Sequence, residues 1–253
     1  MRRWAAIPAA GEARAARLWA LVAGCADGEA VSAAHVCGAA VVAVEADGAA
    51  LSVAARPDRR QRAHATDAVA ALLEEQQFTL GEGPSIEAGS SGGQVLVADV
   101  SAPAGASRWP MFAPAATAAG ARGMFAFPLQ VGAIRLGVLT LYRVRPGSLT
   151  REQVADAVTL CRTAVAVMLA AGRPPLNGAA PDQGAWPLGG PGEGRIEVYQ
   201  ATGMVAVQLG VGLQDAFAAL RARAFTEDVP LARLARQVVD RRLRFHPDDF
   251  PDN

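Results

Sequence analysis

The side chains that most often carry out chemistry are few and scattered in this sequence. His35, His64 and His246 lie far apart, and none stands in an HExxH pattern or another spacing typical of metal ligands. Ser85 follows a Gly-Pro step and lacks the Gly-x-Ser-x-Gly elbow of a hydrolase nucleophile. The loop Leu80–Ser85 has two glycines but no lysine-serine ending, so it does not match a phosphate-binding loop. We therefore expect no catalytic site, no metal site and no cofactor, in a protein that is not an enzyme.

The three cysteines indicate a compartment rather than a site. Cys25, Cys37 and Cys161 are widely spaced and form no Cys-x-x-Cys pair, which argues against a disulfide framework and against a zinc site. Charged residues from Glu12 onward interrupt the N-terminal apolar run, so it lacks the core of a signal peptide. No stretch free of charged residues approaches about 18 apolar residues, the length that a membrane span needs. We expect a cytoplasmic protein without a membrane partner.

Arginine is the remaining residue type that could do chemistry here, through contacts with phosphate groups. The chain has 24 basic and 24 acidic residues and a net charge of zero, so only a local patch could attract a nucleic acid. All 24 basic residues are arginine, a bias that a GC-rich genome explains. Arg233, Arg236 and Arg244 fall opposite the apolar stripe of a predicted helix, although Asp240 lies among them. The same spacing is also that of an ordinary solvated helix face.

A second candidate site is a pocket lined by aromatic side chains. These residues could surround a small ligand beneath the Leu80–Ser85 loop, because ligand pockets are concave and largely apolar. Apolar residues on strands are, however, more often simple core packing. We keep both interpretations, an unidentified small-molecule ligand or a core without one. The pocket residues are Trp109, Phe125, Phe127 and Tyr142, with Phe112 beside them.

Three short helices must position the C-terminal arginines. Between Arg195 and Phe245, apolar residues recur at helical spacing in three separate stretches. Gly210 and Gly212 bracket the first junction, and Asp228 and Pro230 mark the second, where a helix can begin. Connections this short favour antiparallel or nearly antiparallel neighbours in a three-helix bundle. Its apolar stripes are Val198, Ala201, Val205 and Leu209; Leu213, Ala216, Phe217, Leu220 and Ala224; and Leu231, Leu234, Ala235, Val238 and Val239.

The longer N-terminal part mixes strands and helices. Strands joined by hairpins and interrupted by helices indicate an antiparallel sheet flanked by helices, and hence the α+β class. We predict helices over 12–25, 61–77, 109–119 and 152–171, a strand over 94–100, and hairpins pairing 36–44 with 49–55 and 124–131 with 134–142. The predicted organisation is a helical extension at 1–29, a sheet domain at 30–171, a Pro/Gly-rich linker at 172–194, the bundle at 195–246 and a tail at 247–253.

Two short motifs in the predicted bundle belong together. The first helix holds an alanine-x-glycine-hydrophobic step at Ala201–Met204, and the second holds an acid-alanine-aromatic-x-x-leucine-arginine step at Asp215–Arg221. With them the stretch resembles the ANTAR family of RNA-binding antiterminator modules, which often has lysine where this sequence has Thr202. The resemblance implies structured RNA hairpins as partners and a homodimer whose two bundles grip paired hairpins. The residues that we expect to bind RNA are Gln200, Thr202, Gly203, Arg221, Arg223 and Arg233.

A second resemblance covers roughly Ala30 to Ala171. It rests on the order of elements, the Leu80–Ser85 loop, the segment Arg108–Leu129 and the hairpin Val131–Arg143. These features are similar to a GAF domain of the kind joined to ANTAR modules in high-GC bacteria. The resemblance implies a GAF-like fold and a sensory role. The family variant usually has cysteine at the position of Ser85, so thiol-based sensing through this residue is not expected.

These features predict a GAF-ANTAR two-domain regulator of transcription antitermination. We expect it to dimerise through the helices at 12–25 and 152–171, because their apolar stripes exceed what one sheet face can cover. An alternative is a protein-interaction or dimerisation regulator that has lost RNA binding, which Thr202 and the neutral net charge favour. A helix-turn-helix DNA-binding protein fits less well, because no helix presents a dense basic and amide-bearing face.

Overall fold

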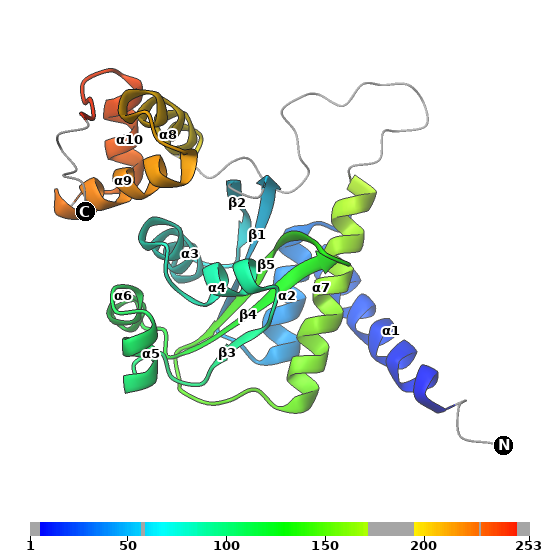
Figure 1. The fold of residues 1–253 in the computed structure, drawn as a ribbon. Coiled ribbons are helices and arrows are strands. Elements are labelled where there is room, and N and C mark those ends of the chain that lie inside the picture. The colour runs from blue at the N-terminus through cyan, green and yellow to red at the C-terminus, as the bar shows by residue number, and fades with distance from the viewer. Residues whose placement is uncertain (1–5, 57–58, 172–194, 228, 247–253) are drawn as a thin grey trace, which may run out of the picture. The chain divides into compact units, whose positions relative to one another are not determined.

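Five antiparallel strands form the sheet on which the N-terminal part of the chain is built. The computed structural model describes residues 6–56, 59–171, 195–227 and 229–246, and the chain divides into a sheet domain and a helical bundle (Figure 1). The predicted linker and tail lie outside the described residues. The elements of the sheet domain are α1 (Ala6–Ala26), α2 (Ala33–Val44), β1 (Gly48–Arg56), β2 (Arg59–Ala65), α3 (Ala68–Leu80), α4 (Pro84–Ser91), β3 (Val95–Val97), α5 (Pro103–Arg108), α6 (Phe112–Ala118), β4 (Gly123–Val131), β5 (Ile134–Arg143) and α7 (Arg151–Ala171).

The strands lie in the order β2-β1-β5-β4-β3. The hairpin of β4 and β5 forms the centre of the sheet, and its register pairs Phe125 with Leu141 and Phe127 with Leu139. The turn between these strands contains Gly132 at φ 58°, a left-handed conformation that glycine adopts readily. The predicted hairpin and the predicted α+β class are both confirmed.

Helices cover both faces of the sheet. α2 and α7 lie on one face with α1 against them, and α3 to α6 lie on the other face (Figure 1). Along β4 the side chains alternate between the two resulting cores, because successive residues of a strand point to opposite faces. Phe125 and Phe127 belong to the core beneath α2 and α7, whereas Met124 and Ala126 belong to the core beneath α3 and α6. Burial on both faces explains why this strand reads as a continuous apolar run.

α7 is the one helix in the described part of the chain that, alone, is long and apolar enough to cross a membrane by length and composition. Its residues Arg151–Ala170 have a mean hydropathy of 1.4. The inner side of α7 packs into the sheet domain, where Ala157 and Leu160 are completely buried. A core helix of this kind meets the same criterion.

Two predicted elements of the N-terminal part are wrong. Residues 36–44, predicted as a strand, belong to α2, which places Val36, Ala40 and Val44 on one buried face. Residues 61–77, predicted as one helix, are divided between the edge strand β2 and α3. Asp67 separates them, because its Oδ1 accepts a hydrogen bond from the amide of Ala70 at 2.8 Å and so caps α3.

Smaller differences concern the ends of the other elements. The loop predicted at 80–85 is shorter and consists of residues 81–83, since α3 ends at Leu80 and α4 begins at Pro84, whose ring suits the first turn of a helix. The helix predicted at 109–119 is the shorter α6, preceded by α5. The N-terminal helix α1 is part of the core rather than an extension outside it, because Leu18 and Val22 are fully buried.

The bundle consists of α8 (Arg195–Leu209), α9 (Leu213–Thr226) and α10 (Leu231–Val239), as predicted. Gly210 ends α8 at φ 69°, and α8 and α9 then turn through 105°. The expected antiparallel arrangement is therefore wrong for this pair, and α8 packs mainly against α10. The bundle core consists of Val198, Tyr199, Ala201, Val205, Ala216, Leu220, Ala224, Leu231, Leu234, Ala235, Val238 and Phe245.

Candidate nucleic-acid interface

One face of α8 carries two of the predicted RNA-binding residues. Gln200 is exposed and Gly203 is partly exposed, and their spacing places them on the same side of the helix as Val207. Val207 is 85 % exposed, a large value for an apolar side chain. A methyl group added at Gly203 would meet no described atom within 4 Å. This face therefore has room for an approaching molecule, which could come close to the helix backbone at Gly203.

Thr202 does not belong to this face. It is only 7 % exposed, and its hydroxyl donates a hydrogen bond of 2.7 Å to the carbonyl of Val198 in the preceding turn of α8. The side chain is thus turned toward the bundle interior with its donor already used. The expectation that Thr202 contacts RNA bases does not fit this position, and we leave it out of the interface.

Arg221, another predicted RNA-binding residue, is only partly exposed on α9. Its guanidinium stands over the ring of Phe217, one turn earlier on α9, with 3.9 Å between the guanidinium carbon and the ring centroid. Burial lowers the pKa of Arg221 to about 10, and Tyr199 acts weakly in the opposite direction. The side chain remains a cation at neutral pH. It combines charge with a structural contact, so a substitution here would disturb both.

Arg223 and Arg233 are the other predicted cations. The Nε of Arg223 lies 2.7 Å from Oε1 of Glu227, one turn later on α9, and its guanidinium lies 5.1 Å from the ring centroid of Phe245. Arg233 is exposed on α10 and forms no ion pair with another described residue. Among the described residues, no acidic side chain pairs with Arg233, whereas part of the charge of Arg223 is offset by Glu227.

Two further exposed arginines lie near this surface and were not singled out from the sequence. Arg241 and Arg242 follow the C-cap residue of α10, Asp240, and Arg244 lies on the same turn. The signal that could have identified them is the sequence Arg-Arg-Leu-Arg at Arg241–Arg244, which begins directly after the C-cap residue Asp240. The helical spacing predicts that Arg244 lies on the same face as Arg233 and Arg236. This prediction is wrong, because α10 ends at Val239.

The predicted aromatic pocket of the sheet domain does not form as one site. Trp109 and Tyr142 lie in the core beneath α3 and α6, while Phe125 and Phe127 lie on the opposite face of the sheet. The four side chains therefore cannot surround a common ligand. The alternation of side chains along a strand separates them. Phe125 and Phe127 point to one face of the sheet, whereas Met124, which pairs with Tyr142, points to the other.

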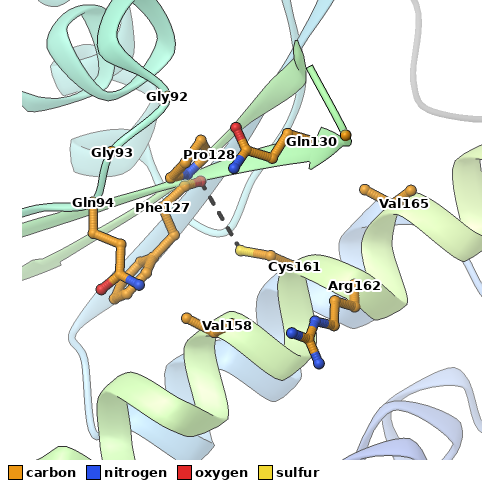
Figure 2. Close-up of a pocket in the computed structure, with 11 residues that line it drawn as sticks. Gly92, Gly93, Gln94, Phe127, Pro128, Gln130, Val158, Cys161, Arg162 and Val165 are labelled. Carbon is orange, nitrogen blue, oxygen red and sulfur yellow. Dashed lines mark hydrogen bonds between the residues drawn. The ribbon is translucent and has the colours of Figure 1, made fainter. Parts of the chain in front are cut away.

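A cavity does lie on the α7 face, between α7, the end of β4 and the segment before β3 (Figure 2). Its volume is about 530 Å³. Phe127 belongs to its lining, together with Gln94, Gln130 and Arg162, so one of the four predicted pocket residues contributes to it. The Sγ of Cys161 lies 3.9 Å from the carbonyl oxygen of Phe127, and burial raises the pKa of this thiol well above its usual value. The thiol of Cys161 therefore stays protonated at neutral pH.

Comparisons with known proteins separate the two parts of the chain. Residues 192–239 match the ANTAR domain family, so the bundle is an ANTAR domain. No curated protein matches the chain. The sheet domain is similar to the GAF domain of a phosphoenolpyruvate-protein phosphotransferase from Coxiella burnetii, at 17 % identity and a TM-score of 0.46, covering 64 % of this chain and 94 % of that one.

Two more solved structures are similar at the same low level. The GAF domain of the Acinetobacter phosphoenolpyruvate-protein phosphotransferase has 15 % identity and a TM-score of 0.46, with 64 % of this chain and 94 % of that chain covered. A domain of a sensor histidine kinase protein from Sinorhizobium meliloti has 17 % identity and a TM-score of 0.41, with 52 % and 85 % covered.

Proposed function

We propose that this chain is a cytoplasmic regulator that binds structured RNA and controls transcription by antitermination. The observation that carries the proposal is the ANTAR match at residues 192–239, which coincides with the three-helix bundle. In this proposal the bundle is the output part of the protein, and the sheet domain is a GAF-like sensor that controls it. Such a protein is a regulator rather than an enzyme.

The bundle offers different groups to the bases and to the backbone of a hairpin. Gln200 can hydrogen-bond to the edges of unstacked loop bases, and Gly203 leaves room for close approach. Arg223 and Arg233 supply charge-assisted contacts to phosphates, which position the RNA without reading its sequence. Arg221 supports this surface from a half-buried position. A hairpin held in this way is an antiterminator, because the overlapping terminator cannot form while it persists.

The sheet domain has space for a small-molecule signal. The cavity beside Phe127 and Cys161, about 530 Å³, falls within the size range of roughly 300 to 1,000 Å³ that small-ligand pockets occupy. Its lining combines apolar groups with the amides of Gln94 and Gln130 and the guanidinium of Arg162, all of which can orient a polar ligand. This is the place where we expect a signal to bind.

We further propose that the protein is a homodimer that joins through α1 and α7. These helices are fixed to each other, since Asp156 of α7 accepts hydrogen bonds from Arg14 at 3.0 Å and from Arg17 at 2.6 Å. Between them lies a groove of about 600 Å³, where small residues leave room and Trp19 is 49 % exposed. A second copy can fill this groove, and two bundles are then available for paired hairpins.

The test of RNA binding is a titration of full-length protein with a pool of synthetic RNA hairpins of constant stem and randomised loop. Arg233→Gln should lower the affinity several-fold and reduce the slope of log affinity against log salt by about one unit, because one phosphate contact is lost. Arg233 is a better site than Arg221, where a substitution also removes the contact with Phe217.

The matched control is Arg145→Gln, which removes the same charge from an exposed position in the sheet domain. It should leave affinity and salt slope unchanged. If the wild-type protein binds none of the hairpins, the RNA-binding function is wrong. If Arg233→Gln behaves like Arg145→Gln, the assignment of Arg233 to the interface is wrong.

A protein-interaction regulator is the second candidate function, and exposed apolar side chains on the bundle favour it. Val207 is 85 % exposed and Phe225 is 61 % exposed, and exposed apolar side chains of this size can serve as contacts with other proteins. This candidate predicts that the wild-type protein binds no hairpin at any salt concentration. It also predicts that Val207→Ser, rather than Arg233→Gln, impairs regulation in the cell.

A further inference from the structure

The turn that follows α10 is basic and lies beyond the part of the chain that matches the ANTAR family. The family match ends at residue 239, and the exposed residues Arg241, Arg242 and Arg244 come after it. We infer that this turn is a second phosphate-binding element, which contacts the backbone of the RNA that the bundle holds. The inference rests on the proposed RNA-binding function and extends it to residues outside the family motif.

The turn is a rigid part of the bundle rather than a loose tail. The amide of Arg241 donates to the carbonyl of Val238 at 3.0 Å, and the amides of Arg242 and Leu243 both donate to the carbonyl of Gln237, at 2.8 and 3.0 Å. These bonds satisfy the last carbonyls of α10 in the manner of a helix C-cap. The backbone that carries the arginines is therefore fixed.

A buried aromatic ring anchors the far end of the turn. Phe245 is 1 % exposed, and its amide donates a hydrogen bond of 2.9 Å to Oε1 of Gln208 on α8. The guanidinium of Arg223 on α9 lies 5.1 Å from the centroid of the same ring. The turn is thus held against α8 and placed beside Arg223, so its arginines extend a surface that is already assigned to RNA.

The backbone conformation of Arg241 is unfavourable for any residue other than glycine. Its φ is 59°, in the left-handed region where a Cβ atom meets the backbone. The helices α3, α4 and α8 end with glycine in that conformation, at Gly81, Gly92 and Gly210, whereas α2 ends with Glu45 at φ 54°. An arginine at the same kind of position sacrifices stability and keeps a cation, which is the pattern expected where the side chain has a function.

Among the described residues, one ion pair involves these three cations. Arg242 pairs with Asp240, at 4.0 Å between its Nε and the Oδ2 of the carboxylate. The side chain of Arg242 is nevertheless 78 % exposed. Arg241 and Arg244 form no ion pair with any described residue. Within the described residues, Arg241 and Arg244 can therefore contact the backbone phosphates of an RNA stem without first breaking an ion pair.

The experiment compares Arg241→Gly, Arg244→Gln and the control Arg145→Gln in the full-length protein, using the same pool of RNA hairpins. Arg241→Gly should raise the Tm of the bundle, because glycine relieves the left-handed strain. It should nevertheless lower RNA affinity several-fold and reduce the salt slope by about one unit. Arg244→Gln should give the same loss of affinity without the gain in Tm. Arg145→Gln should match the wild type in both measurements.

The outcomes separate this inference from the function on which it rests. If wild-type protein binds no hairpin, both the proposed function and the second phosphate-binding element are wrong. If wild-type protein binds and Arg241→Gly and Arg244→Gln bind with unchanged affinity and slope, only the element is wrong. An equal loss in Arg145→Gln would trace the effect to net charge and would also overturn the element.

Discussion

Gly203 shows how a single residue can separate stability from function. Glycine in the interior of a helix destabilises it by roughly 0.5 to 1 kcal/mol relative to alanine. Gly203 lies in the middle of α8, and an added Cβ would meet no described atom within 4 Å. Packing among the described residues therefore does not require glycine there. In the proposed complex, the close approach of an RNA backbone is what glycine at this position would allow.

Gly203→Ala should therefore stabilise the bundle by about 0.5 to 1 kcal/mol and weaken hairpin binding, because the new methyl group occupies the contact surface. Chemical denaturation and the hairpin titration measure the two effects. Gly24→Ala is the matched control, since Gly24 is an exposed glycine of α1 with equally open surroundings. Unchanged hairpin affinity in Gly203→Ala would remove this residue from the proposed interface.

At the scale of elements, Phe245 holds the turn after α10 against helix α8. Phe245→Ala removes a side chain that is 1 % exposed, and such a change typically costs about 3 to 5 kcal/mol. We expect the bundle of this variant to unfold at a lower temperature than in the wild type, while the sheet domain keeps its own transition. Calorimetry can resolve the two.

Phe225→Ala is the comparison for that experiment. Phe225 lies near the end of α9 and is 61 % exposed, so its removal should change the unfolding temperature of the bundle very little. Similar destabilisation by both substitutions would contradict the conclusion that Phe245 anchors the turn after α10.

At the scale of the whole molecule, the proposed dimer depends on the groove between α1 and α7. Light scattering at micromolar concentration should give the mass of a dimer for the full-length protein. Trp19→Glu should shift it toward a monomer, because it places a charge in an apolar contact at a position that is exposed in one chain. Circular dichroism should show unchanged helix content.

Ile134→Glu tests whether any new surface charge has the same effect. Ile134 is 66 % exposed at the start of β5 and is not among the residues that line the groove. This variant should remain dimeric. A monomeric wild-type protein, or a dimer that Trp19→Glu leaves intact, would contradict the arrangement that we propose.

The sequence alone was enough for the elements whose pattern is long or sharply bounded. The three helices of the bundle, α7 and the hairpin of β4 and β5 repeat their apolar residues over many positions, and glycine marks the hairpin turn. The ANTAR motif at Ala201–Met204 and Asp215–Arg221 likewise depends only on residue order, and it matches the family found at residues 192–239.

Tertiary structure decided the cases in which two local patterns compete. The apolar stretch 36–44 fits both a buried strand and a buried helix, and packing between α1 and α7 selects the helix.

Spacing on α8 and α9 could not reveal that Thr202 bonds to its own helix or that Arg221 covers Phe217, because both depend on the local environment of the side chain. Phe245 lies beyond the last helical residue and joins the core only because the turn brings it back to Gln208. Contacts of this kind arise from the folding of distant segments onto each other, and no local periodicity contains them.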